Sequence, residues 1–79
     1  MDNALGRVAQ RIFVSRAKVL AGPPSPHQHW NYSSIAALLR SAGVDVEEVC
    51  NWSKAPDGLG YFIFYYGEAA SETKQLALH

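Results

Sequence analysis

The feature that most restricts the fold of this chain is the run Tyr61-Phe-Ile-Phe-Tyr-Tyr66, which has a glycine on each side. Aromatic and β-branched residues favour strands, so this run predicts a strand over 61–66. The preceding Ala55-Pro-Asp-Gly-Leu-Gly60 is rich in turn-forming residues and predicts a reversal of the chain. We therefore expect Val46–Lys54 to pair with 61–66 in an antiparallel hairpin over 46–66, with a short helix at 46–54 as the alternative.

The predicted strand has large side chains on both faces. Either Phe62, Phe64 and Tyr66 or the alternate residues of 61–66 must pack on helices. The other set then faces outward or is covered by the C-terminal tail. Exposed aromatic side chains on a sheet are typical of protein interfaces and of platforms on which nucleic-acid bases stack.

Two helices are predicted before the hairpin. Residues 1–21 are expected to form an amphipathic helix, because apolar residues recur at helical spacing at Leu5, Val8, Ala9, Ile12, Phe13, Val19 and Leu20. A loop rich in proline and histidine follows over 22–30. A second helix is expected over 31–43, capped by Asn31 or Ser33 and ended by Gly43. The tail at 68–79 is expected to form a short helix, with an edge strand over 74–79 as the alternative.

Length and composition suit one α+β domain over residues 1–79, of which 48% are hydrophobic. In it, a long N-terminal helix and a second helix pack on an antiparallel β-hairpin, and a short C-terminal helix or edge strand follows. A lone Cys50 excludes an internal disulfide and favours a reducing, cytoplasmic location. The longest apolar run is far shorter than the roughly 20 residues that a membrane-spanning helix needs, so no membrane contact is expected.

The two halves of the chain have opposite charge. Residues 1–44 contain five basic side chains and one acidic side chain, a net charge of +4, whereas residues 45–79 have a net charge of −4. On the predicted first helix, Arg7, Arg11 and Lys18 would form a basic ridge. Such asymmetry is typical of interaction surfaces, either for nucleic-acid phosphates or for a charged protein patch.

No residue pattern indicates catalysis. Ser33, Ser34 and Cys50 lack the surroundings of a known nucleophile motif, and no glycine-rich phosphate loop is present. His27 and His29 could both face a metal, but two ligands do not define a metal site. We therefore expect a protein that is not an enzyme and has neither a metal nor a cofactor.

The residues 34–66, SIAALLRSAGVDVEEVCNWSKAPDGLGYFIFYY, resemble the helix–strand–turn–strand stretch of ACT domains, which sense small molecules such as amino acids. The AGV after the helix and the PDG turn are the shared features. The same stretch is similar to a winged helix-turn-helix domain, with 34–42 as the second helix, 46–54 as the recognition helix, and 61–66 with 74–79 as the wing. Asp45, Glu47 and Glu48 would then repel phosphates at the start of the recognition helix.

In overall character the chain is similar to the small inhibitors encoded by phages, among them the anti-CRISPR proteins. That resemblance implies a binding protein that docks on a nuclease or surveillance complex and blocks its nucleic-acid site, with the acidic half in a groove lined by Lys and Arg. The alternatives are a winged-helix-like regulator that binds nucleic acid through the basic ridge and an ACT-like sensor. A protein partner is the first expectation, and a homodimer is also compatible with an exposed hairpin edge.

The expected contact residues combine aromatic anchors with charges of both signs. They are Arg7, Arg11, Lys18, Trp30, Asp45, Glu47, Glu48, Trp52, Tyr61 and Tyr65.

Overall fold

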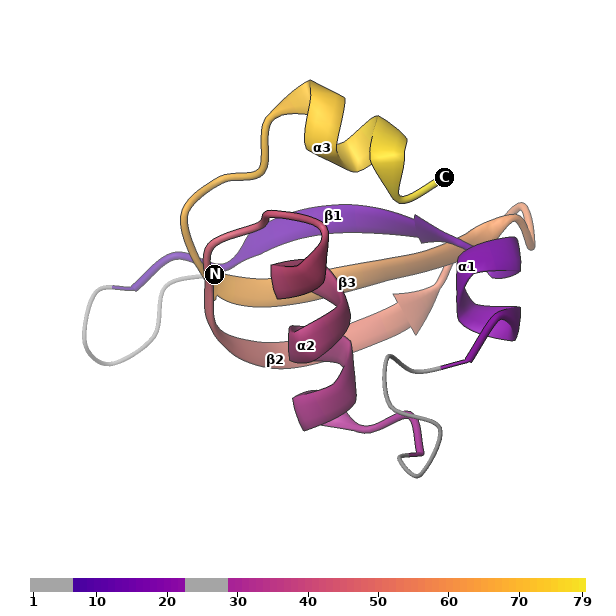
Figure 1. Ribbon diagram of the computed structural model, residues 1–79, viewed down its shortest axis with the longest axis horizontal. Helices are drawn as coiled ribbons and strands as arrows, with labels where there is room; N and C mark the ends of the chain where they lie inside the picture. Colours follow the sequence, from indigo (N-terminus) through magenta and orange to yellow (C-terminus); the bar gives the residue numbers. More distant parts are fainter. Residues whose placement is uncertain (1–6, 23–28) are drawn as a thin grey trace.

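The computed structural model describes residues 7–22 and 29–79 and has an α+β architecture (Figure 1). The elements follow the order β1 (Gln10–Ser15), α1 (Arg16–Leu20), α2 (Tyr32–Ser41), β2 (Val46–Lys54), β3 (Gly60–Gly67) and α3 (Glu72–Ala77). Residues 1–6 and the Pro/His segment 23–28 lie outside the described part of the chain.

The predicted hairpin is confirmed as β2 and β3. Both neighbours of β3 are antiparallel to it, so the strand order is β1-β3-β2. In the β1–β3 pair Ile12 lies opposite Ile63, and in the β2–β3 pair Trp52 lies opposite the same residue. The register of β2 shifts twice, between Val46 and Glu48 and between Val49 and Asn51. These irregularities bend β2, which forms one edge of the sheet.

The core lies between one face of the sheet and the helices. Ile12 and Val14 from β1 and Ile63 and Tyr65 from β3 are almost fully buried. From the helical side, α2 packs mainly against β2, and the side chain of Leu39 has no exposed surface. Figure 1 shows α2 crossing in front of the sheet, with α1 at the end of β1 and α3 beyond β1. Val19 of α1 and Leu78, which follows α3, also pack into this core.

The second helix follows the sequence prediction closely. Asn31 caps α2, and its side chain and that of Ser34 form a reciprocal capping box, each accepting a hydrogen bond of 2.8 Å from the other's backbone N–H. At the other end Gly43 has a φ of +87°, the left-handed conformation that favours glycine. Arg40 then donates hydrogen bonds to the carbonyls of Val46 and Glu47, which ties α2 to the start of β2.

The predicted N-terminal helix over 1–21 is wrong where the structure describes it. Residues 10–15 form strand β1, and only Arg16–Leu20 form a helix, capped by Ser15. The helical pattern arose because both faces of β1 have large apolar side chains: Ile12 is in the core, while Phe13 lies on the opposite face. Alternation between apolar and polar residues is therefore weak, although the segment is a strand.

The C-terminal tail forms helix α3, as expected, so the alternative of an edge strand over 74–79 is excluded. Residues 46–54 form a strand. The winged helix-turn-helix arrangement, in which this segment would be the recognition helix, is therefore excluded as well. No helix within residues 7–22 and 29–79 is long and apolar enough to cross a membrane.

Candidate interaction surface

Strand β3 divides its aromatic residues between the two faces of the sheet. Ile63 and Tyr65 are 4% and 0% exposed and face the helices. Phe62, Phe64 and Tyr66 alternate with them and lie on the opposite face, where they are half-buried. Helices α1 and α2 pack on the core side and α3 lies along β1, so this second face is the more open side of the described structure.

Phe13 extends the open side from β3 to β1. Its ring meets Phe62 edge-on, with 5.6 Å between the ring centroids, and it stacks on the imidazole of His79 at 4.7 Å. Gly60 makes room for this ring, because a Cβ there would lie 2.5 Å from Phe13 Cζ. Together, Phe13, Phe62, Phe64 and Tyr66 form a surface that we call the aromatic face.

Two arginines lie on the aromatic face. The guanidinium carbon of Arg7 is 3.9 Å from the ring centroid of Tyr66, and that of Arg11 is 4.7 Å from the centroid of Phe62. Both distances are within the range of cation–π interactions. Arg7 also forms ion pairs of 3.6 Å with Glu47 and 3.7 Å with Glu48. The register places Glu48 opposite Tyr66, on the same face of the sheet.

The predicted basic ridge does not exist as a helical surface. Arg7 and Arg11 lie on the open side of the sheet, whereas Lys18 lies on α1. Val14, which a helix would place on the same face between Arg11 and Lys18, is only 1% exposed and belongs to the core. The ridge required one continuous helix over 1–21, and the strand conformation of β1 separates its members.

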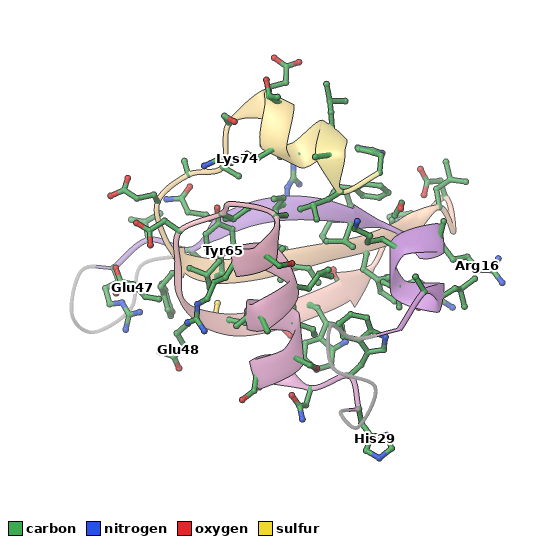
Figure 2. The ribbon with its side chains drawn as sticks, in the orientation of Figure 1. Arg16, His29, Glu47, Glu48, Tyr65 and Lys74 are labelled. Carbon is green, nitrogen blue, oxygen red and sulfur yellow. The ribbon has the colours of Figure 1, made fainter. Side chains whose placement is uncertain are left out.

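Acidic residues gather where β2 begins and β3 ends. Asp45 and Glu68 are joined by a backbone hydrogen bond of 3.0 Å, and Glu47 and Glu48 follow Asp45 directly. We call Asp45, Glu47, Glu48 and Glu68 the acidic end. Figure 2 shows Glu47 and Glu48 at one end of the molecule and Arg16 at the other. Arg7 and Arg40, which belong to the basic half of the sequence, contact Glu47 at this end, so the opposite charges of the two halves are only partly separated in space.

The other predicted anchors lie on the helix side of the sheet. Trp30 is half-buried, and its indole N–H donates a hydrogen bond of 3.1 Å to the carbonyl of Val19. Trp52 is 38% exposed and meets Tyr32 edge-on at 4.8 Å. Tyr61 is half-buried and packs against the core. These residues are therefore not part of the aromatic face.

Tyr65 is a core residue. Its hydroxyl donates a hydrogen bond of 2.7 Å to the carbonyl of Glu68 and accepts one of 3.0 Å from the N–H of Ala70. Burial raises the pKa of this hydroxyl, and the hydrogen bond from Ala70 opposes that rise. A side chain with no exposed surface cannot contact a partner, so Tyr65 positions the segment after β3 instead.

Four residues of the surface were absent from the predicted contact set, namely Phe13, Phe62, Phe64 and Tyr66. Because side chains alternate between the two faces of a strand, the sequence of 61–66 could have identified Phe62, Phe64 and Tyr66 as one of two candidate faces. Phe13 had no such signal, because it lies in a segment predicted as helix.

Within the described residues, no three His, Cys, Asp or Glu side chains lie close enough together to hold a metal ion. His27, one of the two histidines considered as ligands, is outside these residues. Comparison of the chain with protein-family models, curated proteins and solved structures finds no match.

Proposed function

We propose that this chain is a non-enzymatic binding protein that docks on a partner protein through its aromatic face and inhibits or regulates that partner by occlusion. The observation that supports this proposal is the open side of the sheet, where four aromatic side chains share one face and two of them, Phe62 and Tyr66, lie beneath arginines. Aromatic residues and arginine are enriched at the energetically dominant centres of protein interfaces.

The charges around the aromatic face favour a protein over nucleic acid. Single-stranded nucleic acid needs stacking rings together with a positive groove that follows the phosphates. Here the positive charge of Arg7 is balanced by Glu47 and Glu48 at 3.6 and 3.7 Å. Phosphates approaching Tyr66 would therefore meet carboxylates as well as a guanidinium. A surface with mixed charges at the rim suits a protein with complementary charges.

The acidic end adjoins the aromatic face and supports a partner with a basic surface. Glu48 lies opposite Tyr66, and Asp45, Glu47 and Glu68 lie beside it. A protein groove lined by Lys and Arg, as in complexes that process nucleic acid, would attract this end. Occupation of such a groove would exclude the nucleic acid, which is the mode of action expected of an inhibitor encoded by a phage.

Charge reversal on the aromatic face tests the proposal. Tagged wild-type protein and the variants Arg11→Glu and Arg16→Glu would be used as bait in a nuclease-treated bacterial lysate. Both arginines are exposed, but only Arg11 lies on the aromatic face. We expect a stoichiometric protein that wild type and Arg16→Glu retain and Arg11→Glu loses. Equal retention by both variants would refute docking through this face.

A second experiment distinguishes protein binding from nucleic-acid binding. The fluorescence anisotropy of labelled single-stranded DNA and RNA is measured with purified protein at two salt concentrations. We expect no saturable binding. Tight, salt-dependent binding that Arg11→Glu abolishes would identify the aromatic face as a nucleic-acid platform instead.

A further inference from the structure

An apolar cavity of about 180 Å³ opens on the helix side of the sheet, away from the aromatic face. Trp30 and Trp52 line it together with Tyr61, Ile35 and Ile63. Protein interiors are packed so closely that few voids exceed the size of a water molecule. An apolar cavity of about 150 Å³ stays dry and takes up a benzene-sized molecule. This cavity is therefore large enough for one ring or one branched aliphatic group.

A second cavity, of about 350 Å³, adjoins the first, because Val19 and Tyr61 line both. Its other walls include Arg16 and Lys54, two exposed cations. Neither forms an ion pair with an acidic side chain of the described residues, where the only ion pairs are those of Arg7. Because the two cavities share these lining residues, we treat them as neighbouring parts of one groove, with Trp30 and Trp52 at one part and Arg16 and Lys54 at the other.

We propose that this groove binds a small carboxylate with a single apolar ring or branched chain. The apolar group would occupy the cavity between Trp30 and Trp52, and the carboxylate would lie between Arg16 and Lys54. Burial of the ring provides most of the binding energy, and the two cations select the ionised head group. The site is independent of the proposed docking function, since it lies on the opposite side of the sheet.

Phenylacetate and phenylacetamide are suitable probes, because they have the same size and differ in charge. Trp30 and Trp52 are the two tryptophans of the chain and both line the cavity, so tryptophan fluorescence reports binding directly. We expect a saturable change with phenylacetate that weakens as salt is added, and a weaker, salt-independent change with phenylacetamide. Equal binding of the two compounds, or no saturable change with either, would overturn the proposal.

Substitutions that remove one positive charge test where the carboxylate binds. Lys54→Gln should raise the dissociation constant for phenylacetate about two- to fivefold, as expected for loss of one exposed ion pair, and leave that for phenylacetamide unchanged. Lys74→Gln is the matched control, because Lys74 lies on α3 and outside the groove. An equal effect of both substitutions would show that only the net charge of the protein matters and would overturn the assignment of the site.

The proposal for the groove and the proposal for the aromatic face can be refuted separately. Arg11→Glu should not change phenylacetate binding, and Lys54→Gln should not change capture of a protein partner. A variant that loses both activities would show that the two surfaces are not independent.

Discussion

Replacement of Gly60 by alanine should destabilise the protein through one close contact. A Cβ at position 60 would lie 2.3 Å from the carbonyl oxygen of Val14 and 2.5 Å from Cζ of Phe13. The ring of Phe13 can swing aside, but the carbonyl of Val14 belongs to a strand paired with β3. Overpacking of this kind costs about 1–3 kcal/mol, and a backbone atom as the nearest neighbour places the cost near 3 kcal/mol.

Part of this cost is offset, because alanine in a strand is about 0.5–1 kcal/mol more favourable than glycine. The expected net loss is therefore about 2 kcal/mol, which corresponds to a fall of about 8–16 °C in melting temperature for a domain of this size. Thermal unfolding followed by circular dichroism measures it. The Phe13 ring must also leave its place over position 60, so the substitution should alter the aromatic face as well.

Gly58→Ala is the matched control. Gly58 has open space around its Cβ position but a φ of +74°, so its replacement should cost only about 1 kcal/mol of left-handed strain. A melting temperature for Gly60→Ala at or above that of Gly58→Ala would refute the contact argument. Addition of Phe13→Leu to Gly60→Ala should not restore stability, since the contact with Val14 remains. Full restoration would show that the ring, and not the carbonyl, is the obstacle.

Three further predictions concern the hydroxyl of Tyr65 and the cap of α2. Tyr65→Phe should lower the free energy of unfolding by about 1–3 kcal/mol in a denaturant titration, because it leaves the carbonyl of Glu68 and the N–H of Ala70 without their partner; an unchanged midpoint would contradict this. Burial raises the pKa of Tyr65 above its ordinary value of 10.0, so the unfolded chain loses this proton at a lower pH than the folded protein. The stability of the wild-type protein should therefore fall as the pH rises above about 10, and the fall should be smaller in Tyr65→Phe. Asn31→Ala should cost about 1 kcal/mol by removing the cap of α2, whereas Ser33→Ala, at an exposed position in the same helix, should change the midpoint little.

The sequence indicated the types of residue at the candidate site but not which residues form it. Composition indicated aromatic anchors with charges of both signs, and Arg7, Arg11, Glu47 and Glu48 do lie at the aromatic face or its border. Tyr65 was expected among the anchors but is in the core. Within 61–66 the two alternate sets of side chains are almost equally aromatic, so their composition cannot tell which set is covered. The position of α2 and the tail over one face makes that choice.

Local sequence signals determined the hairpin and α2. The glycine-bounded run 61–66, the turn at 55–60, the Asn31 cap and the Gly43 terminator all act within a few residues of the elements they specify. Such signals are independent of the rest of the fold, which is why they can be read from the chain alone.

Strand β1 and the aromatic face were decided only by the tertiary structure. Residues 10–15 have apolar side chains spaced for either a helix or a strand, and their conformation depends on pairing with β3, about fifty residues further along the chain. That pairing brings Phe13 beside Phe62 and places Arg11 over the same ring. A surface assembled from two distant strands has no local pattern, because its members become neighbours only when the sheet forms.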